Sequence, residues 1–255
     1  MQVGKHSRKL VEIRKALQHG TLTADGLLPI EGPTLLAEAR QSGIEVADVF
    51  VRTGAAAPAI LWEHVHDVPP DVFKTIQETE HSQGVIATIR PPQFSLAEVL
   101  NATPALVVVL CRLQDPGNVG TILRISEAFG ATGCIALRGT AGFYNSKVVR
   151  ASAGSLFRLP HVAAISLKET VEALKSRSIR IAGTSPASEA DIAGWDWQMP
   201  TAVFVGNEGS GLNPEELSYC DTVLRIPHKP TVESLNSAIA VAVTLYEASK
   251  VRQLL

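Results

Sequence analysis

The 255-residue sequence has no hydrophobic run long enough to cross a lipid bilayer. Its longest uninterrupted apolar run, residues 105–111, is far shorter than the roughly 20 residues that a membrane-spanning helix needs. The basic N-terminus is not followed by the apolar segment of a secretion signal. We therefore expect a cytoplasmic protein with no membrane span.

Cysteine is scarce, and the sequence offers little else that would bind a metal. Cys111, Cys134 and Cys220 form an odd, widely spaced set in apolar surroundings, which predicts reduced core thiols. His64 and His66 alternate along the chain but have no third ligand nearby. We expect no metal site and interpret these two residues as surface or interdomain histidines.

The chain also lacks an excess of either charge. Its 23 Lys and Arg residues against 25 Asp and Glu residues give a net charge of -2, which excludes a global basic field. Any site for a polyanion must therefore be a local patch. The basic amphipathic segment 5–15 is such a candidate, and it is interpreted either as a solvated helix face or as an RNA contact; its basic residues are Lys5, Arg8, Lys9, Arg14 and Lys15.

A proline pair, Pro91-Pro92, separates two regions of mixed helix and strand patterns. We predict a first domain over residues 1–97 and a second over residues 98–255. The first is interpreted as a small α/β unit, with strands expected at 46–51 and 84–89, helices from Pro33 and around 72–76, and apolar segments at 27–30 and 59–62.

The second region begins with a continuous β-branched run, residues 105–110, which is typical of a strand buried on both faces of a parallel sheet. Strands and helices then alternate, and this order predicts an α/β domain with parallel strands. The strands are expected at 134–137, 179–183, 202–205 and 222–226, and the helices at 119–129, 146–153, 168–175 and 235–251.

The first candidate site segment, residues 115–124, is a turn that leads into a helix. Its glycines do not have the spacing of a dinucleotide fingerprint and no P-loop lysine follows, which argues against a nucleotide-dependent oxidoreductase. On a helical wheel, Arg124 points away from the apolar face, with Gly120 one turn before it. It is either a functional side chain or a solvated arginine.

Two further segments follow predicted strands, and ligands of parallel sheets collect beyond the carboxyl ends of strands. In 203–212, three glycines surround Glu208, which indicates either a ligand site or a hairpin-like turn. In 224–238, two prolines stiffen a loop before a helix that Ser234 could cap. Asn236, expected in the first turn of that helix, would bind an exposed backbone or a ligand, or would serve as a local cap.

These segments contain N-x-G-x-x-x-R at 118–124, G-N-E-G-x-G-L at 206–212 and I-P…E-S-L-N at 226–236. In this order they resemble the three motifs of the SpoU (TrmH) family of RNA ribose methyltransferases, in the SPOUT superfamily. Residues 147–154 also resemble the family. The segments 30–33 and 83–87 are similar to the ribosomal-protein-like substrate-binding domain that many members have.

The resemblance implies transfer of a methyl group from S-adenosylmethionine to a ribose 2'-hydroxyl of RNA, with ribosomal RNA favoured. It implies a sheet whose C-terminal segment forms a trefoil knot, and a homodimer formed through the helix at 235–251. The expected cofactor-binding residues are Thr184, Gly206, Ile226 and Leu235. The residues that match the family's functional positions are Asn118, Arg124, Glu208 and Asn236.

A guanidinium with a pKa above about 12 is a poor base at neutral pH. We therefore expect Arg124 to clamp the adjacent RNA phosphate and to stabilise the developing alkoxide, with Asn118 and Glu208 orienting it. The third loop departs from relatives at residues 228–230 and 237–238. The alternatives are a tRNA ribose methyltransferase, a non-catalytic RNA-binding protein and a nucleotide-dependent oxidoreductase.

Overall fold

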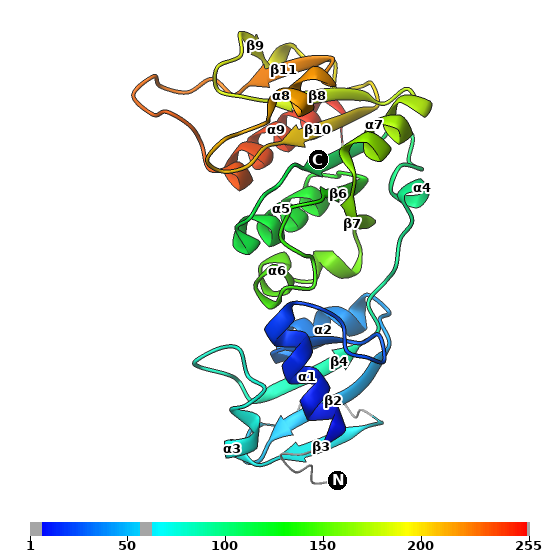
Figure 1. The fold of residues 1–255 in the computed structure, drawn as a ribbon, viewed down its shortest axis with the longest axis vertical. Coiled ribbons are helices and arrows are strands. Elements are labelled where there is room, and N and C mark those ends of the chain that lie inside the picture. The colour runs from blue at the N-terminus through cyan, green and yellow to red at the C-terminus, as the bar shows by residue number, and fades with distance from the viewer. Residues whose placement is uncertain (1–6, 57–62, 254–255) are drawn as a thin grey trace. The chain divides into compact units, whose positions relative to one another are not determined.

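A computed structural model describes residues 7–56 and 63–253 of the chain (Figure 1). The chain forms two compact units. One combines Met1–Pro92 with Gly142–Arg158, and the other combines Gln93–Ala141 with Leu159–Leu255. This division differs from the predicted one, which placed the boundary between residues 97 and 98 and kept the second domain continuous.

Residues 142–158 belong to the first unit because of specific contacts there. The Ser146 hydroxyl donates to the Glu78 carboxylate at 2.6 Å, and the Arg158 guanidinium donates to the Glu38 carboxylate at 2.8 Å. Asn145 lies so close to Gly20 that a Cβ on this glycine would be 3.2 Å from the Asn145 Cα. Contacts between segments this far apart in the chain leave no trace in local sequence patterns.

The first unit contains a four-stranded sheet with the order β1-β4-β2-β3, in which only β2 and β3 are parallel. The strands predicted at 46–51 and 84–89 and the helix at Pro33 are confirmed. The apolar segment 27–30 was not predicted to be a strand but largely forms β1, β3 was not predicted, and the helix expected around 72–76 is a single turn. Lys5 and the apolar segment 59–62 lie outside the described residues. The elements are α1 (Arg8–His19), β1 (Leu28–Glu31), α2 (Pro33–Gln41), β2 (Val46–Arg52), β3 (Val65–Val68), α3 (Pro70–Phe73), β4 (Val85–Ile89) and, from the inserted segment, α6 (Ser146–Ser152) and the 3-10 turn η1 (Ser155–Phe157).

The interpretation of His66 as a surface or interdomain residue is wrong. Its Nε2 lies 2.6 Å from an oxygen of the buried Asp48, which also accepts a hydrogen bond from Lys9 at 2.6 Å. The His66 ring stacks on Phe50 inside this unit, with ring centroids 4.9 Å apart. His64 is exposed, as predicted, and the described residues contain no group of three or more potential metal ligands.

The second unit contains a seven-stranded, all-parallel sheet with the order β7-β6-β5-β10-β8-β11-β9. The predicted parallel α/β architecture is confirmed. The elements missed from the sequence are short or lie at a sheet edge, where the burial pattern is weak. The elements are α4 (Leu96–Val99), β5 (Leu106–Leu110), α5 (Pro116–Ala128), β6 (Gly133–Leu137), β7 (His161–Ile165), α7 (Leu167–Ser176), β8 (Arg180–Thr184), β9 (Ala190–Asp191), η2 (Ile192–Gly194), β10 (Thr201–Val205), α8 (Pro214–Ser218), β11 (Thr222–Arg225) and α9 (Ser237–Val251).

Helices α5 and α9 pack against each other, and an edge-to-face contact between Phe129 and Tyr246 joins their C-terminal regions. Helix α5 begins earlier than predicted because Asp115 caps it and a proline occupies the first turn. Helix α9 begins later than predicted, directly after Asn236. The two helices therefore bring the first and third sequence motifs to neighbouring helix N-termini.

No helix within the described ranges is both long and apolar enough to span a membrane. All three cysteines are free thiols, as predicted. Burial is the main cause of their raised pKa values; the pKa of Cys220 is about 11, and those of Cys111 and Cys134 are also well above the ordinary thiol value. These thiols are therefore protonated at neutral pH.

Candidate active site

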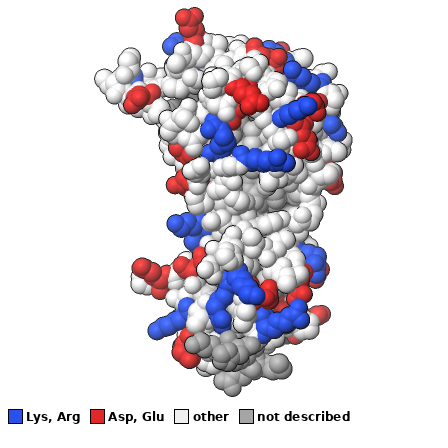
Figure 2. Space-filling model, in the orientation of Figure 1, with Lys and Arg blue, Asp and Glu red and all other residues white. Residues whose placement is uncertain are grey.

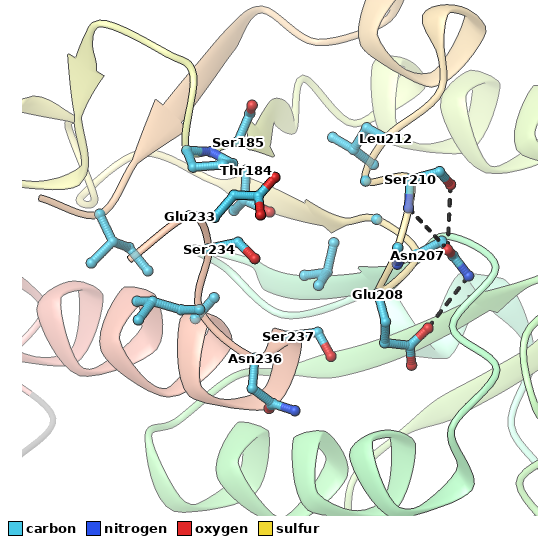
Figure 3. Close-up of a pocket in the computed structure, with 18 of the residues that line it drawn as sticks. Thr184, Ser185, Asn207, Glu208, Ser210, Leu212, Glu233, Ser234, Asn236 and Ser237 are labelled. Carbon is cyan, nitrogen blue, oxygen red and sulfur yellow. Dashed lines mark hydrogen bonds between the residues drawn. The ribbon is translucent and has the colours of Figure 1, made fainter. Parts of the chain in front are cut away.

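A cavity of about 560 Å³ lies in the second unit, where strands β8, β10 and β11 end and helix α9 begins (Figure 3). This is the carboxyl edge of the parallel sheet, the place where the sequence predicts a ligand site. Segments 184–186, 205–212, 224–228 and 233–240 contribute to its lining. The second and third sequence motifs thus form two walls of one pocket.

The four residues expected to bind the cofactor all line this pocket; they are Thr184, Gly206, Ile226 and Leu235. Thr184 ends β8, and its hydroxyl donates a hydrogen bond to the Phe204 carbonyl at 3.2 Å. Of the four residues expected at functional positions, Glu208 and Asn236 line the pocket. Asn118 and Arg124 do not.

The glycine-rich segment forms a hairpin-like turn closed by an antiparallel bridge between Asn207 and Gly211. The turn places backbone against backbone at Gly206, where a Cβ would lie 2.1 Å from the carbonyl carbon of Gly211. Gly206 is therefore required by the chain's own close approach. The interpretation as a hairpin-like turn is confirmed, and the same turn lines the pocket.

Asn207 organises this turn, although it was not singled out from the sequence. Its Oδ1 accepts from the amides of Gly209 and Ser210 at 3.0 and 3.2 Å, as Figure 3 shows in part. Its Nδ2 donates to the Arg112 carbonyl at 3.1 Å. The only signal in the sequence was its place between two glycines and an acid, where asparagine commonly hydrogen-bonds the backbone of a turn.

Glu208 lies against the N-terminus of α5. Its carboxylate accepts from the backbone amides of Asp115 and Gln114 at 3.1 and 3.3 Å, and from the Asn118 side chain at 3.4 Å. Burial raises the pKa of the Glu208 carboxyl, but these hydrogen bonds outweigh it, so that the pKa is lowered. Glu208 therefore stays ionised at neutral pH and complements the positive end of the helix.

Asn236 joins the third motif to the first. Its Oδ1 accepts from the Ala238 and Ile239 amides at 2.9 and 3.3 Å, and its Nδ2 donates to Asn118 Oδ1 at 3.1 Å. The local-cap interpretation is thus correct, and the expectations that Ser234 caps α9 and that Asn236 lies in its first turn are wrong. A continuous chain of hydrogen bonds runs from Glu208 through Asn118 to Asn236.

Arg124 lies outside this network. It is exposed on α5, as the helical wheel predicts, and the described residues provide no hydrogen bond or ion pair for it. It follows Asn118 along the helix by about 9 Å, at about 1.5 Å per residue. Asn118 and Glu208 were expected to orient Arg124; within the described residues they are hydrogen-bonded to each other, and no contact joins either side chain to Arg124.

The pocket lining combines apolar side chains with carboxylates. Leu212, Leu224 and Ile226 provide apolar surface, whereas Glu208 and Glu233 provide negative charge. No Lys or Arg is found among the described lining residues. Such a lining fits a ligand that has a flat apolar part and a net positive charge, as S-adenosylmethionine has.

Known structures share this fold. This chain is similar to a crystal structure of an RNA 2'-O ribose methyltransferase, with 29% identity and a TM-score of 0.82. The match covers 99% of this chain and 100% of the other. The chain is also similar to the SpoU methyltransferase AviRb from Streptomyces viridochromogenes in complex with AdoMet, at 26% identity and a TM-score of 0.87. That match covers 97% of this chain and 99% of AviRb.

Sequence comparison then gives the family. Residues 105–246 match the SpoU rRNA Methylase family, and the chain belongs to it. An uncharacterized tRNA/rRNA methyltransferase from Synechocystis is 34% identical over 96% of this chain and 90% of its own length. The 23S rRNA (guanosine(2553)-2'-O)-methyltransferase RlmP from Bacillus subtilis is 32% identical over 85% of this chain and 86% of its own length.

Proposed function

We propose that this protein transfers a methyl group from S-adenosylmethionine to the 2'-hydroxyl of a ribose in ribosomal RNA. The observation that best supports this is the hydrogen-bonded chain from Glu208 through Asn118 to Asn236, which unites all three sequence motifs beside one pocket. Relatives named as 23S rRNA 2'-O-methyltransferases support ribosomal RNA as the substrate class.

The pocket would hold the cofactor between its two walls, through Thr184, Gly206, Ile226 and Leu235. When bound, S-adenosylmethionine supplies an electrophilic methyl group on a sulfonium sulfur. Glu208 and Glu233 give the pocket a negative charge that favours this cation. Membership in the family supports a trefoil knot in the segment that forms the pocket's third-motif wall.

Arg124 is proposed as the residue that serves the RNA. Its exposed guanidinium would clamp the phosphate beside the reacting ribose and stabilise the developing alkoxide, because a planar fork of donors matches a phosphate. The proton of the 2'-hydroxyl would leave to that phosphate, to water or transiently to Arg124. The guanidinium is a poor base because it is already protonated at neutral pH.

Asn118, Glu208 and Asn236 are proposed to position the reacting groups. Glu208 and Asn118 fix the first turn of α5, and this sets the direction in which the following turns present Arg124. Asn236 holds the start of α9 against the same turn. In this account, the network positions Arg124 through the helix and not by direct contact.

The N-terminal unit is proposed to bind the RNA. Lys and Arg side chains gather on its surface among acidic ones (Figure 2). On α1, Lys9 is held by Asp48, whereas Arg8 is exposed and reaches Asp25 only at 3.8 Å. The Arg8→Ala variant should therefore bind RNA with a less steep salt dependence, by up to about 0.7 in log-log slope per lost phosphate contact.

A homodimer is proposed to form through α9. Ile239 and Tyr246, seven residues apart and so on one face of this helix, are 52% and 48% exposed, which leaves apolar surface for a second copy. Sedimentation velocity tests this: wild type should sediment as a dimer and the Ile239→Glu variant as a monomer.

A cytoplasmic location is proposed as well. The relatives' action on ribosomal RNA and the free thiols support it.

The experiment that tests the proposed function measures methyl transfer from labelled S-adenosylmethionine to two acceptors, unmodified ribosomal RNA and unmodified transfer RNA. Label in ribosomal RNA alone is the expected result. Label in transfer RNA alone would establish the tRNA methyltransferase alternative. Cofactor binding without transfer to either RNA would favour the non-catalytic RNA-binding alternative.

A further inference from the structure

An ion pair between the half-buried Arg112 and a buried carboxylate lies behind the glycine-rich wall of the pocket, residues 206–212. The Arg112 guanidinium donates from Nε and Nη2 to the two carboxylate oxygens of Glu216, each at 2.9 Å. The Glu216 side chain is only 3% exposed, and the same Nη2 also donates to the Gly211 carbonyl at 3.3 Å. Neither residue belongs to the three sequence motifs.

The Arg112 backbone is held in an unusual conformation. Its φ of 62° lies in the left-handed region, which is unfavourable for a residue with a Cβ. Its amide donates to the Thr140 hydroxyl at 3.1 Å, and its carbonyl accepts from Asn207 Nδ2 at 3.1 Å. Such a conformation persists only where the surrounding contacts fix it, and it is often found near functional sites.

Together these contacts reach both ends of the turn 207–211. The Arg112 carbonyl binds the first residue of the turn, Asn207, and the guanidinium binds the last, Gly211. Between these two points, the turn presents Glu208 to the N-terminus of α5. A shift at either end would move the carboxylate and the backbone that lines the pocket.

We infer that Arg112, held by Glu216, is a positioning residue that sets the shape of the glycine-rich wall of the cofactor pocket. This inference rests on the proposed function for the identity of the cofactor. Arg112 itself does not line the pocket. Arg112 instead stabilises the conformation of the glycine-rich wall in the ligand-free protein.

The competing explanation is that the pair only stabilises the fold. Arg112→Met alone cannot separate the two, because it leaves the buried Glu216 carboxylate without its partner, which destabilises a protein strongly. Arg112→Met combined with Glu216→Gln removes that unpaired charge, and the glutamine oxygen can still accept from the Asn213 amide as Glu216 does at 2.7 Å. The double variant should regain stability but not the contact with Gly211.

The test compares wild type, Arg112→Met, the double variant and Arg138→Met. Arg138 is a matched control because it is an arginine of the same unit that donates to a single backbone carbonyl, that of Ala164, away from the pocket. Three quantities are measured on each full-length protein: the melting temperature, amide hydrogen exchange of residues 206–212 without ligand, and the dissociation constant for S-adenosylhomocysteine by calorimetry.

In the double variant we expect a melting temperature near that of wild type, exchange of the turn at least 10-fold faster, and affinity at least 10-fold weaker. The Arg138 control should match wild type in all three. Recovery of both affinity and exchange together with the melting temperature would overturn the inference. If wild type does not bind S-adenosylhomocysteine, the proposed cofactor is wrong, and exchange of the ligand-free turn alone then decides the role of Arg112.

Discussion

The two walls of the pocket are built by different means. The glycine-rich wall, residues 206–212, is fixed by side-chain hydrogen bonds of Asn207 and Glu208 and by the bridge from Asn207 to Gly211. The other wall is formed by the third motif, residues 226–236. Its residues 229–234 are exposed and make no side-chain hydrogen bond within the described chain. Within this stretch the Val232 amide donates to the Lys229 carbonyl at 3.0 Å.

This difference shows how one pocket can combine a fixed part and an adaptable part. The glycine-rich wall holds a carboxylate at a helix N-terminus, where a displacement would cost hydrogen bonds to backbone amides. The third-motif wall depends on Pro227 and Pro230, which restrict the backbone without hydrogen bonds. Substitutions in the first wall should therefore have larger effects than substitutions in the second.

The largest effect is expected from Gly206→Ala. The added Cβ would lie 2.1 Å from the Gly211 carbonyl carbon, so the turn cannot keep its shape. We expect affinity for S-adenosylhomocysteine to fall more than about 100-fold, measured by calorimetry, together with methyl transfer.

Gly194→Ala is the control in the same unit. A Cβ there would have no described atom within 4 Å, and Gly194 is not among the residues that line the pocket, so its affinity should stay within about twofold of wild type. Equal losses in the two variants would show that the effect comes from replacing any glycine and not from the close approach at Gly206.

Arg124→Ala tests a residue on neither wall. Because Arg124 is exposed and unpaired within the described residues, we expect kcat to fall by about 10²–10³-fold while cofactor affinity is nearly unchanged. Arg124→Lys keeps the charge but loses the planar fork of donors, so it should also lose most of the turnover with little change in RNA binding.

Asn236 connects the walls, and two variants separate its two contacts. Asn236→Ala removes the cap of α9 and should lower stability by about 1 kcal/mol, measured by urea unfolding. Asn236→Asp keeps an acceptor for the cap but loses the donor to Asn118. If the link to Asn118 matters, both variants should lose about tenfold in kcat while only the alanine variant loses stability; full activity in Asn236→Asp would contradict this role.

The smallest effect is expected from the titration of Glu208. Because its pKa is lowered in the folded protein, the ionised carboxylate stabilises the turn. This contribution is fully present above the ordinary glutamate pKa of about 4.3 and is lost as the pH falls through the lowered pKa of the folded state. The stability difference between wild type and Glu208→Gln should therefore shrink on acidification below about pH 4; a constant difference would contradict the assignment.

The sequence predicted much of the second unit because its signals are local. The run 105–110 and the alternation of strands and helices after it indicated a parallel sheet. The motifs follow directly after predicted strands, and this placed the motifs at one edge of the sheet. The packing of residues 142–158 onto the first unit could not be predicted, because its partners Glu38 and Glu78 are far away in the chain.

The same limit applies within the site. Arg112 looks like any arginine after a strand, and its role depends on Glu216 and Gly211, which lie about a hundred residues later in the chain. Asn236 was expected inside a helix because the apolar pattern begins before it, but its side chain satisfies the amides of Ala238 and Ile239 and so ends the loop there. Hydrogen bonds of this kind are not encoded in hydrophobic periodicity.

The most direct test of the account is the chemical position of the transferred methyl group. Ribosomal RNA treated with the wild-type protein and S-adenosylmethionine is digested to nucleosides, and the methylated product is identified by mass spectrometry beside a parallel reaction with Arg124→Ala. We expect a nucleoside methylated on the ribose 2'-oxygen with wild type and, at equal enzyme concentration and within the initial-rate period, about 10²–10³-fold less of it with the variant. A methyl group on a base, or equal ribose methylation by Arg124→Ala, would contradict it.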